Sequence, residues 1–185
     1  MKKTVKNCLS MLAICFLVAG SMPDESQLCL AASKLGPGNY QFVIVHQGVS
    51  RKYDVHVPLS YRSFKPMPVV LNFHGGGGGA PQHRVMTGMD KTADQGGFIS
   101  VYPWGSGKNP DISNGRFWNP GFNYFEGTDN AYLSQVDDIG FVNKILDDLI
   151  LKFKVDQSRV YAAGLSNGGI FAQRLGCDLD RKSVV

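Results

Sequence analysis

A serine framed by glycines is the residue of this chain best placed to do chemistry. Gly164, Leu165, Ser166, Asn167 and Gly168 form a G-x-S-x-G motif, in which the serine hydroxyl is a candidate nucleophile for acyl transfer. Glycines at both ends of this motif leave room for a sharp backbone turn that pushes the hydroxyl outward. The motif is short, so its context must decide between a nucleophile and an ordinary serine at a helix start.

A run of five glycines, Gly75–Gly79, follows His74 and is the second candidate for chemistry. Glycine exposes backbone N–H groups, which are the donors that an oxyanion hole directs at the oxygen that becomes negative during acyl transfer. A phosphate-binding loop is the rival interpretation, but Ala80 and Pro81 stand where a Walker sequence requires Gly-Lys-Ser/Thr. A dinucleotide site is also disfavoured, because Asp94, about twenty residues on, lies at the far end of a predicted helix rather than at the end of a strand.

The segments next to these motifs predict the elements that position them. Val69–Phe73 is a short, mostly apolar run, typical of a parallel strand buried on both faces, and it ends at the glycine run. Arg159–Ala163 predicts a strand that enters the serine motif, and a helix that continues through Leu175 leaves it. A serine on such a strand-to-helix turn lies at the carboxyl edge of the sheet and at a helix N-terminus, which favours the nucleophile interpretation.

Other periodic segments complete the pattern of an α/β protein. Strands that alternate with helices predict a sheet whose parallel part is covered on both faces, and the sequence shows no internal repeat. The remaining expected segments are an antiparallel hairpin (Tyr40–His46 with Arg51–Val57), a strand (Phe98–Tyr102), two helices (Met89–Gln95 and Ile139–Phe153) and a turn (Asp156–Ser158).

A long loop without clear periodicity covers residues 104 to 135, and loops of this length inside a domain are usually functional. Trp104 and Trp118 are candidate substrate-binding side chains, because aromatic rings can form a platform for a ring or an apolar part of a ligand. Packing in the core is the alternative for both. The other aromatic candidates in this loop are Phe117, Tyr124 and Phe125.

Two adjacent aspartates precede a predicted helix, and neither they nor the other polar residues indicate a cofactor site. Asp137 and Asp138 precede the apolar face of a predicted helix, where they either cap the helix or support the site from a second layer. No group of His, Cys and Asp residues has the spacing of metal ligands. The sequence therefore predicts neither a metal nor a cofactor.

The first twenty residues predict a secretory signal peptide. A basic start precedes twelve mostly apolar residues, Cys8–Ala19, and small residues follow where a signal peptidase reads. Twelve helical residues span only ~18 Å of a ~30 Å hydrocarbon core, so stable membrane association after cleavage is not expected. Cleavage as late as about residue 32 is the alternative boundary. We expect a secreted or extracytoplasmic protein whose partial catalytic domain covers residues 36–185.

The charge of the chain disfavours a nucleic-acid-binding protein, and its cysteines allow at most one disulfide within the mature chain. The chain of 185 residues has a formal net charge of +4, and Lys2, Lys3 and Lys6 in the expected signal carry three of these charges, which leaves about +1. No cluster of Lys and Arg remains, so nucleic acid is not an expected partner. Of the four cysteines only Cys29 and Cys177 lie outside the signal. They either pair with each other, or Cys177 packs on a helix or pairs with a group outside this chain.

Taken in order, these motifs resemble the poly(3-hydroxybutyrate) depolymerase / feruloyl and acetyl xylan esterase group of secreted α/β-hydrolases. The resemblance covers about residues 36 to 180 and implies an α/β-hydrolase fold with the N-terminal hairpin, parallel strands and flanking helices. It further implies a serine carboxylic-ester hydrolase without a cofactor, acting on small or polymeric ester substrates, polyesters or polysaccharide-linked acyl esters among them. The matching stretches are His74–Gly77, Tyr102–Pro103, Trp118–Asn119, Val136–Phe141 and Arg159–Gly169.

The resemblance also implies roles for single residues. Ser166 would be the nucleophile, and the turn around it would be the nucleophile elbow. The other implied residues are Gly164, Leu165 and Gly168 in the elbow, and Gly75, Gly76, Gly77 and Asn167 as backbone donors of the oxyanion hole.

A base for the serine is missing from the expected place. In this fold the acid and the histidine of the triad follow the serine, but all four histidines precede Ser166, and only Asp178 and Asp180 follow it. His74 is expected to shape the glycine turn rather than to act as the base. The chain thus resembles the N-terminal part of an esterase, truncated after the elbow helix, and we expect it to be inactive. The alternative is a non-catalytic remnant that at most binds acyl or carbohydrate ligands.

Overall fold

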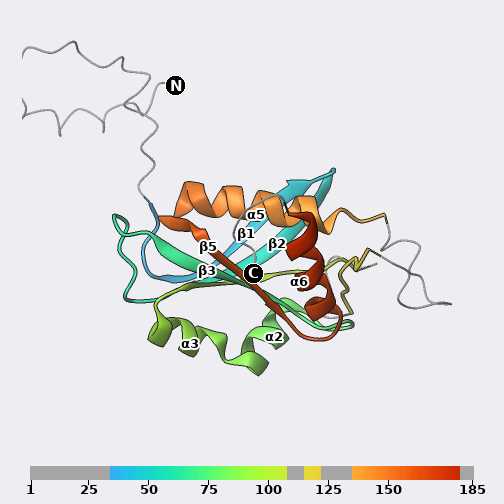
Figure 1. Ribbon diagram of the computed structural model, residues 1–185, viewed down its shortest axis with the longest axis horizontal. Coiled ribbons are helices and arrows are strands. Elements are labelled where there is room, and N and C mark those ends of the chain that lie inside the picture. Colours follow the sequence, from blue (N-terminus) through green and yellow to red (C-terminus); the bar gives the residue numbers. More distant parts are fainter. Residues whose placement is uncertain (1–33, 108–114, 122–134, 180–185) are drawn as a thin grey trace, which may run out of the picture. The chain divides into compact units, whose positions relative to one another are not determined.

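The computed structural model describes residues 34–107, 115–121 and 135–179. The expected signal peptide, Cys29, Tyr124, Phe125 and Asp180 lie outside these residues. Within the described ranges, a five-stranded sheet has the order β1-β2-β4-β3-β5 (Figure 1). The elements are β1 (Gly38–His46), β2 (Val49–Val57), β3 (Met67–Phe73), α2 (Ala80–Thr87), α3 (Met89–Gly96), β4 (Ile99–Pro103), α5 (Asp138–Lys152), β5 (Val155–Gly164) and α6 (Asn167–Asp178).

The predicted hairpin is confirmed and forms one side of the sheet. β1 and β2 pair antiparallel with His46 opposite Val49, and the two residues of the turn, Gln47 and Gly48, have φ of 50° and 78°. Positive φ at both turn residues matches the right-handed twist of the flanking strands. β2 also pairs antiparallel with β4, whereas β4-β3 and β3-β5 are parallel, so the hairpin extends the predicted parallel part.

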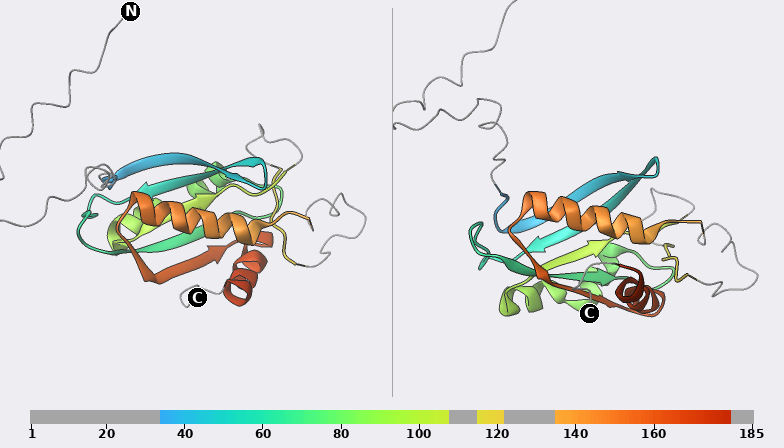
Figure 2. Two further views of the ribbon diagram at one scale, coloured as in Figure 1. Left: turned by 90° about the horizontal axis from the view of Figure 1, so that it is seen from above. Right: turned by 45° about the horizontal axis from the view of Figure 1, so that its top comes forward.

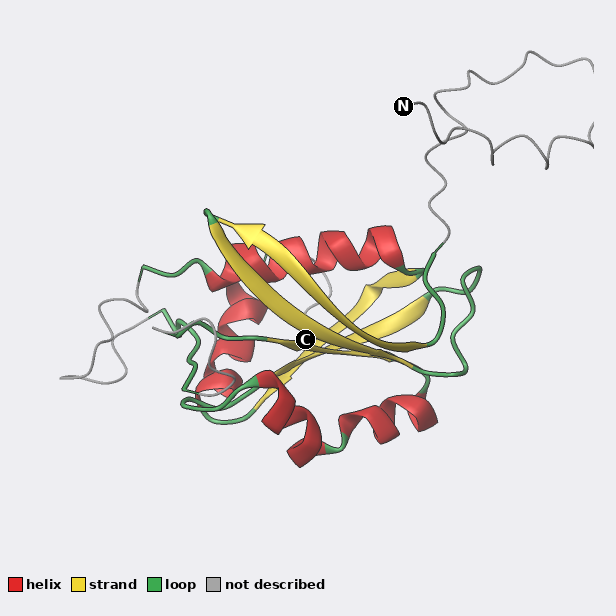
Figure 3. Ribbon diagram, turned by 180° about the vertical axis from the view of Figure 1, so that it is seen from behind, coloured by secondary structure: helices red, strands yellow, loops and turns green. Residues whose placement is uncertain are grey.

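Helices cover both faces of the sheet. α5 lies along one face, and α6 starts at the end of β5 (Figure 2). α2 and α3 lie on the opposite side from α5, as the view from behind shows (Figure 3). The main core forms where the inward side chains of α5 and α6 meet the strands; its largest fully buried members include Tyr53, Phe73, Trp118, Phe141, Ile145, Leu149 and Phe171.

The structure extends the sequence predictions at two places. α2 was not expected. It begins after Gly79 and has Pro81 in its first turn, where a backbone N–H has no partner within the helix, so proline costs no hydrogen bond there. The turn expected at Asp156–Ser158 lies inside β5, at an irregularity where the pairing moves from Met67–Val155 to Val69–Val160. There the Asp156 carboxylate accepts the N–H of Ser158 at 3.0 Å, a local bond that competes with regular pairing.

β5 lies at the edge of the described sheet, paired with β3 on one side. Its C-terminal end runs directly into α6 at the serine motif (Figure 1). None of the helices in the described residues is both apolar enough and long enough to cross a bilayer.

Candidate active site

Ser166 lies on a strained turn between β5 and α6. Its φ of 50° and ψ of −120° are unusual for a residue with a side chain. A Cβ added at Gly164 would lie 2.3 Å from the carbonyl oxygen of Gly168, and one added at Gly168 would lie 2.3 Å from that of Phe73. Glycine at both positions is therefore required for the tight crossing of strand, turn and helix, and the turn leaves Ser166 exposed.

The glycine turn after β3 touches this elbow. A Cβ added at Gly76 would lie 3.4 Å from Cβ of Asn167, and one added at Gly75 would lie 3.5 Å from the carbonyl oxygen of Leu165. The N–H of Gly77 donates to the carbonyl oxygen of Arg116 at 2.8 Å, so it is already occupied.

Three backbone donors remain beside the serine. Within the described residues, the N–H groups of Gly75, Gly76 and Asn167 make no hydrogen bond. Asn167 is the first residue of α6, so its N–H lies at the positive end of the helix. Four backbone donors were named from the sequence. The N–H groups of three of them are therefore unbonded, and the fourth, that of Gly77, is already used in a hydrogen bond.

The side chain of Asn167 connects the elbow to the segment at Trp118 by two hydrogen bonds. Its Oδ1 accepts the N–H of Trp118 at 2.7 Å, and its Nδ2 donates to the carbonyl oxygen of Trp118 at 3.0 Å. Asn167 is 2% exposed. This two-way contact was not anticipated from the sequence, which had named Trp118 as a candidate substrate-binding residue and Asn167 as a backbone donor.

The two candidate substrate-binding tryptophans are both buried. Trp118 packs against Phe73 and Phe171 with ring centroids 5.1 Å apart in each pair, and its indole N–H donates to the carbonyl oxygen of His74 at 3.0 Å. Trp104 donates its indole N–H to the carboxylate of Asp54 at 3.1 Å. These contacts favour core packing, the alternative to a platform for substrate.

His74 shapes the glycine turn. Its Nδ1 donates to the carbonyl oxygen of Gly75 at 2.8 Å, and its Nε2 accepts the N–H of Gly105 at 3.0 Å. Burial lowers the pKa of His74 to about 4, so the ring is neutral at pH 7. Because both ring nitrogens are occupied, His74 has no nitrogen left to accept a proton from Ser166.

The other three histidines belong to β1, β2 and α2, outside the serine motif. Nε2 of His46 lies 3.0 Å from a carboxylate oxygen of Asp137, and Nε2 of His56 lies 3.0 Å from one of Asp94. His83 is buried in α2, and its burial lowers its pKa. Within the described residues no histidine contacts Ser166.

The two aspartates at the start of α5 have separate tasks. Asp137 caps the helix, because its Oδ1 accepts the N–H of Gly140 at 2.8 Å. Asp138 is buried, accepts the N–H of Asn119 at 2.7 Å and pairs with Arg51 at 2.6 Å; its burial raises its pKa. Asp138 thus binds Asn119, the residue next to Trp118. Of the two roles considered from the sequence, Asp137 has that of the helix cap and Asp138 that of a support for the segment beside the site.

The fold and this turn define the class: the chain has the α/β-hydrolase fold predicted from the sequence. A solved structure that matches it is the LpqC poly(3-hydroxybutyrate) depolymerase from Bordetella parapertussis, with a TM-score of 0.59 and 18% identity over 80% of this chain and 50% of that one. That likeness shows the fold alone. No protein-family model matches the chain.

Among curated proteins, the relatives of this chain are esterases, which confirms the resemblance stated from the sequence. Feruloyl esterase B of Piromyces equi is 30% identical over 129 residues, 70% of this chain and 22% of the relative. Feruloyl esterase B of Thermothelomyces thermophilus is 34% identical over 112 residues, 58% of this chain and 33% of the relative. The chain thus spans between a fifth and a third of the length of these two relatives.

Proposed function

We propose that this chain carries the nucleophile and the oxyanion donors of a secreted serine ester hydrolase that acts on polysaccharide-linked or polyester acyl esters. The observation that supports this most is Ser166, exposed on a strained elbow, with the unbonded N–H groups of Gly75, Gly76 and Asn167 beside it. The names of the curated relatives, feruloyl esterases and a bifunctional acetylxylan esterase/xylanase, support the class of ester.

The chemistry follows from the order in which bonds change. Oγ of Ser166 attacks the ester carbonyl carbon, its proton passes to a general base, and the carbonyl oxygen becomes negative. The N–H of Asn167 and one from Gly75 or Gly76 stabilise that oxygen, assisted by the N-terminus of α6. The base then protonates the departing alcohol, and water hydrolyses the acyl-serine in a second step.

The base is the group that this chain does not provide. Both nitrogens of His74 are occupied, and His46 and His56 pair with carboxylates of other elements. His83 is buried in α2 and makes no contact with Ser166 within the described residues. We therefore infer that the polypeptide of this sequence is inactive alone and that a hydrolytic cycle requires an imidazole from outside these 185 residues. Without such a group, the chain would at most bind acyl or carbohydrate ligands.

Export belongs to the same proposal and is supported by the basic start and the apolar run Cys8–Ala19. Mass spectrometry of the protein recovered outside the cytoplasm of an expressing bacterium should find its first residue between about 21 and 33. Recovery only of uncleaved protein in the cytoplasm would contradict export.

Hydrolysis of p-nitrophenyl acetate with and without added imidazole tests the catalytic proposal. Without imidazole, the chain and its Ser166→Ala variant should differ by less than about twofold, because oxyanion donors alone give a rate that does not depend on the serine. With imidazole, the unchanged chain should exceed the Ser166→Ala variant and form an acyl-serine detectable by mass spectrometry.

The two possible failures of this test have different meanings. Ser166-dependent turnover without imidazole would contradict the inference that the chain lacks its own base. An equal response of both proteins to imidazole, with no acyl-serine, would contradict the assignment of Ser166 as the nucleophile. Imidazole also hydrolyses the ester directly, and the Ser166→Ala variant measures that background.

A further inference from the structure

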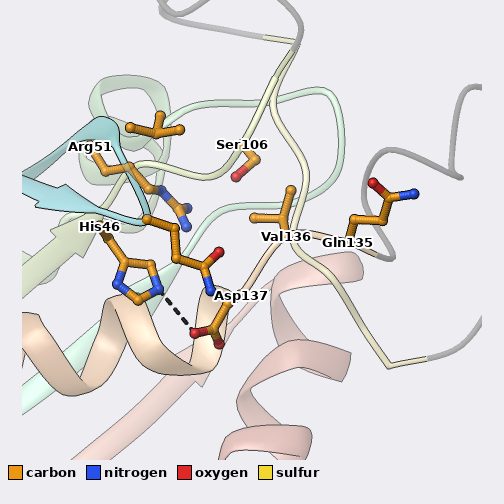
Figure 4. Close-up of a pocket in the computed structure, with 8 residues that line it drawn as sticks. His46, Arg51, Ser106, Gln135, Val136 and Asp137 are labelled. Carbon is orange, nitrogen blue, oxygen red and sulfur yellow. Dashed lines mark hydrogen bonds and ion pairs between the residues drawn. The ribbon is translucent and has the colours of Figure 1, made fainter.

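A pocket separate from the elbow lies between the tip of the β1-β2 hairpin and the start of α5 (Figure 4). It has a volume of about 210 Å³. The guanidinium of Arg51 and the hydroxyl of Ser106 lie across the pocket from the carboxylate of Asp137 (Figure 4). Gln47 and Val49 complete the side formed by the hairpin. The volume suits a ligand of the size of one sugar ring rather than a drug-sized molecule.

The charged groups of the pocket are largely neutralised by partners within the protein. Arg51 is 7% exposed; it pairs with Asp138 at 2.6 Å and donates to the carbonyl oxygen of Trp104 at 3.1 Å. Asp137 bonds to His46 and to the N–H of Gly140, yet its side chain is 40% exposed. The pocket therefore offers a carboxylate acceptor without an unpaired cation, which disfavours an anionic ligand.

Three neutral side chains of the pocket make no hydrogen bond within the described residues. These are the amides of Gln47 and Gln135 and the hydroxyl of Ser106, although Ser106 is only 8% exposed. Nδ1 of His46, which also lines the pocket, is buried without a hydrogen-bond partner among these residues. The backbone is fixed at two of these positions: at Gln47 by its turn with a φ of 50°, and at Ser106 by reciprocal bonds with Phe117 at 2.9 and 2.8 Å. Donors and acceptors beside the apolar Val49 match a ligand with several hydroxyl groups on a hydrocarbon ring.

The pocket lies close to the glycine turn. Gly78 forms a β-bridge with Arg116, and the next residue, Phe117, forms one with Ser106. Neighbouring strands are about 4.8 Å apart, so two such spacings place Ser106 roughly 10 Å from the glycine turn. The ring of Phe117 contacts the same turn, since a Cβ at Gly76 would lie 2.8 Å from it. The segment that carries Ser106 is thus linked through Phe117 to the glycine turn that borders the elbow.

We propose that this pocket binds a neutral sugar residue of the glycan that carries the ester group, through Gln47, Ser106 and Asp137. The inference rests on the proposed function for the choice of a glycan ester, but sugar binding itself needs neither the nucleophile nor a base. The pocket would hold the carbohydrate portion of the substrate while the acyl group reaches the elbow.

Isothermal titration of the full chain with xylotriose tests the proposal. We expect saturable binding that Ser106→Ala and Asp137→Asn each weaken by at least about tenfold, the effect of losing a buried or charged hydrogen bond. Asparagine still caps a helix, so Asp137→Asn removes charge without removing the cap. Gln47→Gly suits the positive φ of the turn and should weaken binding as well.

The matched control is Gln95→Ala, which removes a side-chain amide from an exposed position of α3. It should bind xylotriose like the unchanged chain, and unfolding curves should show that all variants remain folded. Absence of xylotriose binding, or binding that the three pocket variants do not alter, would overturn the proposal. Binding of inorganic phosphate in place of xylotriose would overturn it too, since it would assign the pocket to an anion. None of these three results would affect the assignment of Ser166 as the nucleophile.

Discussion

The side-chain amide of Asn167 binds both the N–H and the carbonyl oxygen of Trp118, at 2.7 and 3.0 Å. Asn167 directly follows Ser166, and Trp118 belongs to a segment that is 49 positions away in the chain. This pair therefore fixes the start of α6 against the core, where Trp118 packs on Phe73 and Phe171. The elbow is held from both sides: by its glycines against β3 and by this amide against the Trp118 segment.

Asn167→Ala should destabilise the protein by about 2–4 kcal/mol, because two buried backbone groups of Trp118 lose their partner. Urea unfolding, followed by tryptophan fluorescence, measures the change. Gln173→Ala is the control in the same helix; that side chain is exposed, so its replacement should change the free energy of unfolding by no more than about 0.5 kcal/mol. Equal effects of the two substitutions would contradict a fastening role for Asn167.

Gly164→Ala and Gly168→Ala should each cost at least about 3 kcal/mol of stability, since an added Cβ would lie 2.3 Å from a backbone oxygen that cannot move aside. Thermal unfolding, monitored by circular dichroism, is the measurement. Gly36→Ala provides the comparison, because a Cβ there would have no atom within 4 Å. A melting temperature of either elbow variant equal to that of Gly36→Ala would show that the turn is not as tight as described.

The free energy of unfolding should fall as the pH is lowered from about 6.5 to about 4, and protonation of His74 should contribute to this fall. Burial lowers the pKa of His74 from its ordinary 6.5 to about 4, so the unfolded chain binds a proton in this window that the folded chain does not. The neutral ring contributes stability that is fully present above pH 6.5 and is lost by pH 4, at most about 3 kcal/mol.

Urea unfolding of the chain and of His74→Gln between pH 7.5 and pH 4 isolates this contribution. The variant should be less stable at pH 7.5, because glutamine does not reproduce both ring contacts, and its stability should fall less steeply with decreasing pH. His83, whose pKa burial also lowers, adds a decline in the same direction to both proteins. Parallel pH profiles of the two proteins would contradict a neutral, buried His74.

Much of the fold could be predicted because each element has a local signature. The hairpin shows in its turn residues, α5 in the spacing of Phe141, Ile145 and Leu149, and β3 in its apolar run before His74. α2 lacks such a signature: within it only Ala80 and His83 are buried, so its sequence shows little amphipathic pattern. It was therefore missed.

The partners of single side chains could not be predicted. Nothing local to Trp104 or Trp118 indicates whether an aromatic ring in a long loop faces a substrate or the core, and both are buried. In the same way, the sequence placed Asp137 and Asp138 together, whereas the structure gives one the helix cap and the other the contact with Arg51.

The sequence by itself determined the order of the strands and of the helices other than α2, and the turn that contains Ser166, because hydrophobic period and glycine position act over a few neighbouring residues. Only the tertiary structure decided which glycine N–H groups remain unbonded, that both nitrogens of His74 are occupied, and that Gln47, Ser106 and Asp137 share a pocket. These features join segments far apart in the chain, and their geometry is set by the packing of the whole sheet and its helices.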